Sequence, residues 1–221
     1  IDDFFFFFSR KPPGPLFSPK ESENDLEKYP ALVPVTLDLS HQIEAGEPSL
    51  SRMFNGWPAD YPDIDKKLTF ERSTAHNVAN YVTTERGICA LLLGASGVGK
   101  TTAARQAIIS LKKNGYLCWE HKGDYTLPES WVDLARSLSK EGKKAVLFID
   151  DAHAHIRQLN TLIDHITAEG VSSLSLILTS NYSNWRPRHK TPAFFKCSRT
   201  FQMSRLDDGE IDRLLNLVDA N

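Results

Sequence analysis

Apolar runs alternate with segments of helical periodicity along the chain from about residue 60 onward. Short apolar runs bounded by glycine or polar turns predict strands that are buried on both faces of a sheet. Such runs occupy residues 88–93, 116–120, 145–149 and 174–179. Residues 201–203 read as a last short strand.

The segments between these runs carry apolar residues three or four positions apart, which predicts amphipathic helices. One helix is expected over Thr101–Asn114, because Gly115 follows as a typical C-terminal cap. A second is expected around residues 128–140, and a third from Ile156 until Gly170 ends it. Upstream, the spacing from Ile64 to Val82 predicts one or two further helices.

Alternation of strands and helices predicts the α/β class: a three-layer α/β/α sandwich with a mainly parallel sheet. Ligands of such sheets bind at the carboxyl ends of the strands. Residues 31–40 are expected to add a short edge strand, where Pro34 is tolerable. Residues 1–50 as a whole read as a linker-like segment, and we assign no function to the Phe4–Phe8 run.

Composition narrows the class of protein further. The net charge is −2 over 221 residues, so no global basic field points to nucleic acid. Three widely spaced cysteines favour neither a disulfide framework nor a tetrahedral metal site, and a cytoplasmic location fits them best. No apolar run is long enough to cross a membrane. Because the chain starts at Ile1, we expect a piece of a longer polypeptide.

The strongest chemical signal is a complete phosphate-binding loop, G-x-x-x-x-G-K-[ST], between a predicted strand and a predicted helix. Backbone N–H groups of such a loop and the helix N-terminus bind phosphate oxygens. Lys100 is expected to reach the β- and γ-phosphates, and the Thr101 hydroxyl to bind Mg²⁺. The predicted nucleotide-binding residues are Gly94, Ala95, Ser96, Gly97, Val98, Gly99, Lys100, Thr101 and Thr102.

A second element fits the same site. The strand at residues 145–149 ends in Asp150 and Asp151, the pattern of a Walker B element. Asp150 is expected to hold Mg²⁺ through water. Asp151 is placed to orient or deprotonate the water that attacks the γ-phosphate.

Polar residues after the next strand give weaker signals. Asn181 follows the strand at residues 174–179 and is either a turn residue or a sensor of the γ-phosphate at the same sheet edge. Basic residues follow in a predicted loop, where a solvated surface is the simpler interpretation. These are Arg186, Arg188, His189 and Lys190.

Residues 88–181 resemble the ATPase core of the additional-strand P-loop class, which includes the AAA+ and STAND families. Residues 53–64, with Arg72 after them, look like the aromatic-glycine-proline segment that precedes the P-loop in STAND modules of prokaryotic antiviral defence proteins. In this segment Phe54 and Trp57 are either ordinary core anchors or an adenine pocket. The resemblance implies that Asn181 acts with Lys100 and Asp151 in catalysis.

The C-terminal residues resemble the entry into a STAND or AAA+ helical lid. Asp207 and Glu210 form a predicted capping box at the start of a helix, whose apolar face continues through Val218. The predicted organisation is therefore a linker-like segment at 1–50, a segment with helices at 51–87, the NTPase core at 88–205 and the start of a lid at 206–221.

The function expected from these features is a Mg²⁺-dependent, slowly turning ATPase. It would switch the oligomerisation and activation of a larger signalling or defence protein, with effector and sensor domains in the same chain. ATP and ADP are the expected ligands, and a homo-oligomer the expected assembly. Two alternatives stay open: a DNA-associated AAA+ ATPase, and a P-loop small-molecule kinase, which the adjacent carboxylates at 150 and 151 disfavour.

Overall fold

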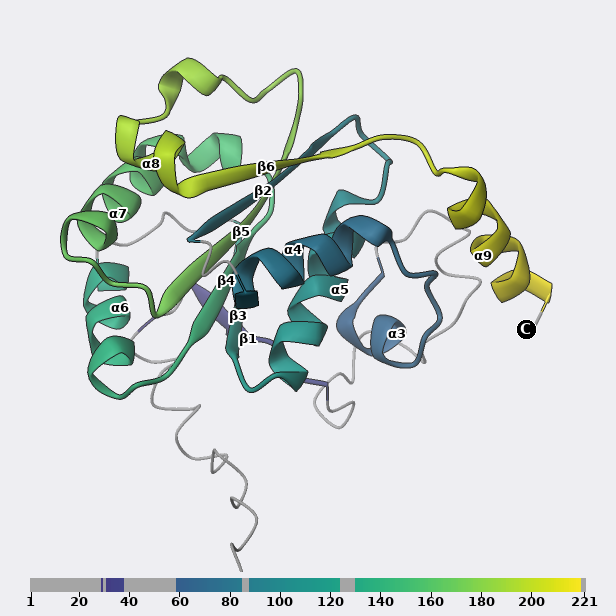
Figure 1. Cartoon of the computed structure of the whole chain (residues 1–221), viewed down its shortest axis with the longest axis horizontal. Coiled ribbons are helices and arrows are strands. Elements are labelled where there is room, and N and C mark those ends of the chain that lie inside the picture. The colour runs from purple at the N-terminus through teal and green to yellow at the C-terminus, as the bar shows by residue number, and fades with distance from the viewer. Residues whose placement is uncertain (1–28, 30, 38–58, 85–87, 124–129, 220–221) are drawn as a thin grey trace, which may run out of the picture. The chain divides into compact units, whose positions relative to one another are not determined.

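A computed structural model of the chain describes residues 29, 31–37, 59–84, 88–123 and 130–219. The described helices and strands fall in one compact unit, Ala31–Asn221 (Figure 1). Among these described helices, none is long and apolar enough to cross a membrane. In chain order the elements are β1 (Leu32–Pro34), α3 (Tyr61–Asp65), α4 (Ser73–Thr84), β2 (Cys89–Gly94), α5 (Lys100–Lys113), β3 (Leu117–His121), α6 (Ser130–Lys140), β4 (Ala145–Ile149), the 3-10 helix η2 (Ala152–His155), α7 (Ile156–Ala168), β5 (Leu174–Asn181), the 3-10 helix η3 (Pro187–His189), α8 (Pro192–Cys197), β6 (Ser198–Met203) and α9 (Asp208–Asp219).

The six described strands form one sheet in the order β1-β3-β4-β5-β2-β6. All neighbours are parallel except β1, which pairs antiparallel with β3 at the edge of the sheet. Strand β5 therefore lies between β2, which leads into the phosphate loop, and β4, which leads into Asp150. This insertion defines the additional-strand class of P-loop folds, as the resemblance implied.

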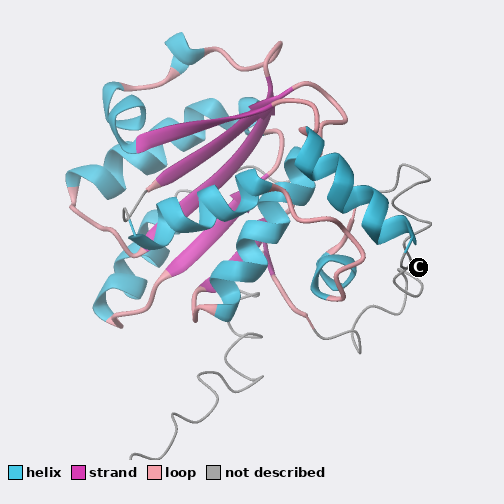
Figure 2. Cartoon of the chain, turned by 45° about the vertical axis from the view of Figure 1, so that its right-hand side comes forward, coloured by secondary structure: helices cyan, strands magenta, loops and turns pink. Residues whose placement is uncertain are grey.

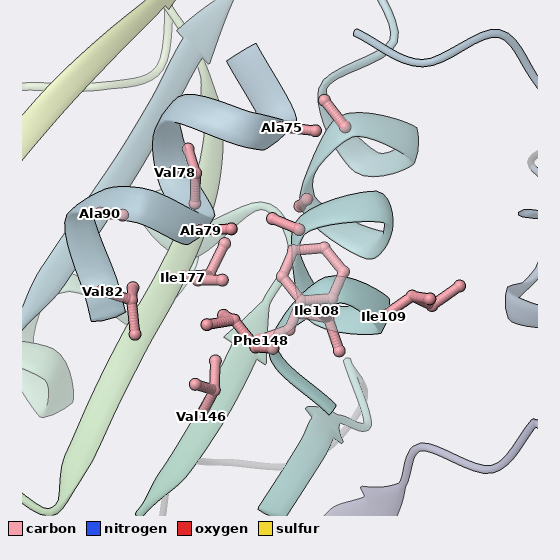
Figure 3. Packing of buried hydrophobic residues seen from close by; sticks show 14 of the residues in the cluster. Ala75, Val78, Ala79, Val82, Ala90, Ile108, Ile109, Val146, Phe148 and Ile177 are labelled. Atoms are coloured by element: carbon pink, nitrogen blue, oxygen red, sulfur yellow. The ribbon is translucent and has the colours of Figure 1, made fainter. Parts of the chain in front are cut away.

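Helices cover both faces of the sheet and give the three predicted layers (Figure 2). On one face, α4 and α5 pack against alternate residues of the central strands. Val78 and Ile108 from these helices meet Val146, Phe148 and Ile177 from the sheet, and all five are fully buried (Figure 3).

The intervening strand residues point to the opposite face, where α6 and α7 lie. Trp131 of α6 and Leu159 and Ile163 of α7 are also fully buried. The central strands β2 and β4 are thus buried on both sides, which explains why they read as continuous apolar runs.

The predicted elements are present with small shifts. β4 matches residues 145–149, and Gly115 and Gly170 follow α5 and α7 with positive φ. The prediction for β5 was too short, because the strand continues through Ser180 to Asn181, held in register by Leu93 and Gly94 of β2.

Of the short helical elements that were missed, two follow β5. The segment predicted as a basic loop contains η3, and α8 follows it. Thr191 caps α8, its hydroxyl accepting a hydrogen bond from the Phe194 backbone N–H. Both elements are under seven residues long, too short to show a helical period in sequence.

Candidate functional site

The phosphate loop is the turn between β2 and α5. A side chain at Gly94 would meet the Met203 carbonyl oxygen and Val98 Cγ2, both 2.8 Å from its Cβ. Gly99 precedes α5 with φ +84°, in the left-handed region that a glycine adopts without strain. The loop therefore curls tightly at the carboxyl edge of the sheet, before the N-terminus of a fourteen-residue helix.

The buried side chain of Lys100 lies inside this curl. Its ammonium donates to the Ala95 carbonyl oxygen at 2.7 Å and to Asn181 Oδ1 at 2.8 Å. Burial lowers the pKa of Lys100, and the charges of Asp150 and Asp151 oppose that shift. A cation held by two neutral acceptors is free to bind the anionic oxygens of a phosphate.

Thr101 and Asp150 bring two oxygen donors together. The Thr101 hydroxyl donates to Asp150 Oδ2 at 2.9 Å across the gap between α5 and β4. The other carboxylate oxygen, Oδ1, accepts from the fully buried Thr179 hydroxyl and from the Asp151 backbone N–H at 3.1 Å. Asp150 is thereby fixed in orientation, with one oxygen toward the phosphate loop.

Asp151 is held differently. Its backbone adopts φ +45°, an unusual value for a residue other than glycine, although aspartate tolerates this region better than most. Its side chain is 68% exposed, and Oδ1 lies 4.0 Å from His153 Nδ1. Both carboxylates are exposed, but hydrogen bonds fix the orientation of Asp150, whereas the Asp151 carboxylate has only the distant His153 beside it among the hydrogen bonds and ion pairs of the described residues.

These side chains line one pocket of about 690 Å³. One part is made by the predicted residues Ser96, Gly97, Val98, Gly99, Lys100, Thr101, Thr102, Asp150, Asp151 and Asn181. Gly94 and Ala95 lie just outside that lining, at the end of β2 and the start of the loop. The remaining walls come from two segments that the sequence did not assign to the site, Thr69, Phe70 and Arg72 before the loop and Ser204, Arg205 and Leu206 after β6.

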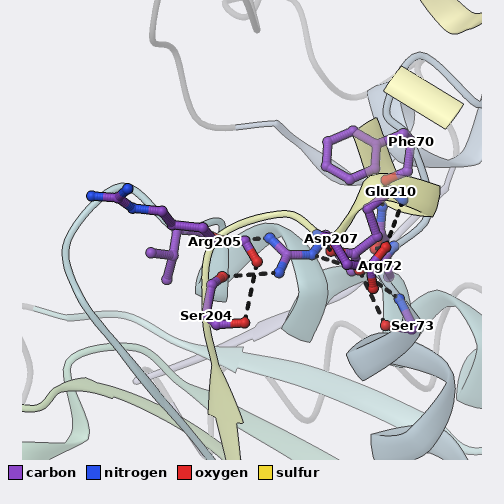
Figure 4. Close-up of polar contacts among 9 residues, drawn as sticks. Phe70, Arg72, Ser73, Ser204, Arg205, Asp207 and Glu210 are labelled. Atoms are coloured by element: carbon purple, nitrogen blue, oxygen red, sulfur yellow. Dashed lines mark hydrogen bonds and ion pairs between the residues drawn. The ribbon is translucent and has the colours of Figure 1, made fainter. Parts of the chain in front are cut away.

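Two side chains that hold residues of the site in place, Thr179 and Arg72, were not assigned from the sequence. Thr179 carries a hydroxyl group within an otherwise largely apolar strand, two residues before Asn181 and on the same face of the sheet. A buried hydroxyl needs a hydrogen-bond partner, so its presence in the strand was a usable signal. Arg72 was noted only as part of the resemblance. In the structure it joins the phosphate loop to the segment after β6, as Figure 4 shows.

Other predicted residues lie elsewhere. Phe54 and Trp57 are outside the described residues. Arg186, Arg188 and His189 are exposed, and none of them lines the pocket. Lys190 is half-buried, and its ammonium lies 5.1 Å from the centroid of the Phe194 ring.

The donor set fits Mg²⁺ and a polyphosphate. Hydroxyl and carboxylate oxygens are the ligands that Mg²⁺ takes in proteins, together with oxygens of a bound phosphate and water. Thr101 and Asp150 supply one of each, and Lys100 lies beside them.

The sheet order and the phosphate loop define a P-loop NTPase of the additional-strand class. A family model described as Novel STAND NTPase 5 matches residues 51–192, which is more than half of the chain. The chain belongs to this STAND NTPase family. No match was found among the curated proteins.

Solved structures of AAA+ ATPases are similar to this chain. Caenorhabditis elegans PCH-2 is 17% identical over 67% of this chain and 44% of its own length, with a TM-score of 0.39. The ORC2 protein of Aeropyrum pernix, in ADPNP-ADP complexes, is 15% identical over 66% of this chain and 49% of its own, with a TM-score of 0.46. The chain therefore matches less than half of either protein.

Proposed function

We propose that this chain is the ATP-dependent switch module of a larger signalling or defence protein. It binds ATP with Mg²⁺ in the pocket described above, hydrolyses it slowly, and controls oligomerisation of the full-length protein. The observation that carries the proposal is the convergence of Lys100, Thr101, Asp150 and Asn181 in one pocket whose far wall is the segment leading into α9.

Each residue has a chemical task in this proposal. Lys100 exchanges its Ala95 acceptor for β- and γ-phosphate oxygens and keeps its hydrogen bond to Asn181. Thr101 and Asp150 hold Mg²⁺, which would neutralise charge on the phosphates. Asp151 orients the attacking water and accepts its proton, and Asn181 keeps Lys100 and the γ-phosphate in position.

The environment of Asp151 supports slow turnover. A general base works best when its position is fixed relative to the water it deprotonates. Asp151 is 68% exposed, and among the described residues its carboxylate oxygen Oδ1 pairs with His153 at 4.0 Å. A second molecule or another part of the full-length protein would then order Asp151, which ties hydrolysis to assembly.

The proposed ligands are ATP and ADP. The proposal also includes a cytoplasmic location, and effector and sensor domains in the same chain.

ATP binding and hydrolysis by the purified chain test the proposal. Wild type should bind ATP in a Mg²⁺-dependent way and turn it over slowly. Lys100→Ala should weaken ATP binding by about 100-fold or more, because hydrogen bonds to charged groups contribute about 1.5–3 kcal/mol each. Lys143→Ala is the matched control, since Lys143 pairs with Glu141 on the surface and does not line the pocket. Wild-type affinity in a folded Lys100→Ala variant would remove the assignment.

Oligomerisation is tested on the full-length protein by gel filtration with and without ATP. A larger species that forms only with nucleotide supports switching.

The exposed basic side chains of Arg186, Arg188 and His189 favour one second candidate, a DNA-associated ATPase. Turnover stimulated by DNA, and lost when these three residues are replaced by glutamine, would favour that candidate over the switch.

A further inference from the structure

Arg72 forms three hydrogen bonds from its guanidinium to three different segments. Nη1 donates to the Val98 carbonyl oxygen in the phosphate loop at 2.7 Å, and Nη2 to the Ser204 carbonyl oxygen after β6 at 3.2 Å. Nε donates to Glu210 Oε1 at 3.0 Å. Figure 4 shows the guanidinium between Ser204 and Glu210. One side chain thus joins the phosphate loop to the first turn of α9.

The pair formed by Arg72 and Glu210 is buried. Their side chains are 6% and 3% exposed, so the two charges are shielded from solvent and compensate each other. Glu210 Oε1 also accepts from the Ser73 backbone N–H at 3.2 Å and from the Ser73 hydroxyl at 3.1 Å. A carboxylate is stabilised there, because Ser73 is the first residue of α4 and the N-terminus of a helix attracts anions.

Glu210 is also the point at which α9 is anchored. It is the sole buried residue among the twelve of this helix. Its backbone N–H donates to Asp207 Oδ1 at 2.7 Å, and its Oε2 accepts from the Asp207 N–H at 3.4 Å, which completes the predicted capping box. The apolar residues Ile211, Leu215 and Val218 are 40%, 55% and 43% exposed. Leu214 and Leu217 are half-buried, so Glu210 is the most deeply buried contact of the helix within the described residues.

The first turn of α9 is thus held by an ion pair whose other end touches the phosphate loop. Arg72 Nη1 also lies 3.6 Å from the position of a Cβ on Gly99, next to Lys100. A phosphate bound to the N–H groups of this loop would also fix the Val98 carbonyl, which belongs to the same loop. A change in the loop would therefore reach Glu210 through one planar guanidinium group, which carries all three donors.

We infer that Arg72 is a positioning residue that couples nucleotide occupancy of the phosphate loop to the start of α9 through Glu210. The inference rests on the proposed function and adds its regulation. Thermodynamic reciprocity follows: if the nucleotide stabilises α9, loss of the Arg72–Glu210 pair weakens nucleotide binding by the same factor. Typical coupling corresponds to about 5- to 150-fold in affinity.

The test compares amide hydrogen exchange of residues 208–219 with and without saturating ATP and Mg²⁺, together with ATP affinity. In wild type, ATP should slow exchange in α9. In Glu210→Gln, which keeps the shape and loses the charge, exchange in α9 should be fast and equal with and without ATP, and ATP affinity should fall about 5- to 150-fold.

Two further variants keep the inference falsifiable. Removing one partner of a buried pair destabilises a protein, so Arg72→Met/Glu210→Leu replaces both charges with apolar groups that pack. It should fold, as circular dichroism reports, and should lack the response of α9 to ATP. Glu169→Gln is the control, because it breaks an exposed ion pair with Arg136 outside the pocket. It should behave as wild type.

The outcomes separate the two proposals. Failure of wild type to bind ATP overturns the proposed function and the coupling with it. ATP binding without any change in α9 exchange overturns the coupling alone. Unchanged ATP affinity in Glu210→Gln and in the double variant shows a merely structural pair, and also overturns the coupling.

Discussion

The ammonium of Lys100 donates a 2.8 Å hydrogen bond to Oδ1 of Asn181, the last residue of β5. The contact exists because β5 is inserted between the strands that carry the phosphate loop and Asp150. Asn181 pairs in register with Gly94, so its side chain reaches the loop from the neighbouring strand. A neutral amide holds the lysine in place and leaves its charge available.

Substitutions of Asn181 should therefore depend on charge as well as on shape. Asn181→Asp places a carboxylate beside Lys100 and near the expected phosphates, so ATP affinity should fall about tenfold or more from like-charge repulsion. Asn181→Ala should keep affinity within about tenfold and mainly slow turnover. Affinity from calorimetry and single-turnover rates measure the two effects. Equal affinities in the two variants would contradict a position next to the phosphates.

The two carboxylates should separate metal binding from chemistry. Asp151→Asn should still bind ATP and Mg²⁺, while turnover falls by roughly the 10²- to 10⁴-fold typical of a lost general base. Asparagine also tolerates the left-handed backbone of this position. Asp150→Asn should instead weaken Mg²⁺-dependent binding. If both variants lose binding equally, the pair acts as one metal site.

Thr101→Val keeps the shape of the side chain and removes the hydroxyl that donates to Asp150. Mg²⁺ should then strengthen ATP binding less than in wild type, because one oxygen ligand is missing. Affinities in Mg²⁺ and in EDTA measure this dependence. The prediction fails if the ratio of the two affinities stays at the wild-type value.

Much of the fold follows from the sequence, because the central strands are buried on both faces and leave continuous apolar runs. The core of the site follows as well, since the residues of the phosphate loop are contiguous in sequence and Asp150 ends an apolar strand. The sequence predicted Asn181 at the carboxyl edge of the sheet, where it lies, although β5 is two residues longer than predicted.

The rest of the pocket depends on contacts between distant segments. Arg72 and Glu210 are 138 positions apart, and each has a complete local interpretation, one before a helix and one in a capping box. Nothing in either local pattern indicates that the two side chains form a buried pair. The Thr69–Phe70 wall was missed for the same reason, because only folding brings it to the phosphate loop.

Gly99→Ala tests whether the backbone conformation of the phosphate loop is needed for ATP binding, with Gly142→Ala as the matched control. Gly99 and Gly142 have φ of +84° and +66°, so alanine at either position is strained by roughly 1–2 kcal/mol. Thermal unfolding should show similar losses of stability in the two variants. ATP affinity should fall only in Gly99→Ala, because Gly142 does not line the pocket. Loss of affinity in both variants would mean that the effect is one of general stability.

Recognition of the base is the last feature to test, because the phosphate contacts do not distinguish one nucleoside from another. Phe70 lines the pocket beside the phosphate loop and Leu206, so it is placed to contact the base of a bound nucleotide. Stacking of a base on an aromatic ring contributes about 1–3 kcal/mol, which corresponds to roughly a 5- to 150-fold loss of ATP affinity in Phe70→Ala. The affinity for tripolyphosphate, which has no base, should stay unchanged.

Phe195→Ala is the control for that comparison, since Phe195 is 69% exposed on α8 and does not line the pocket. Phe54 and Trp57 lie outside the described residues, and the sequence leaves open whether they anchor the core or form an adenine pocket. The same two ligands, with GTP added, decide between these alternatives. A pocket residue loses ATP affinity and keeps apo stability when replaced by alanine, whereas a core anchor loses apo stability and keeps the preference for ATP over GTP. Equal losses for ATP and tripolyphosphate in Phe70→Ala would show that the ring supports the phosphate loop, and the base would then have to bind elsewhere.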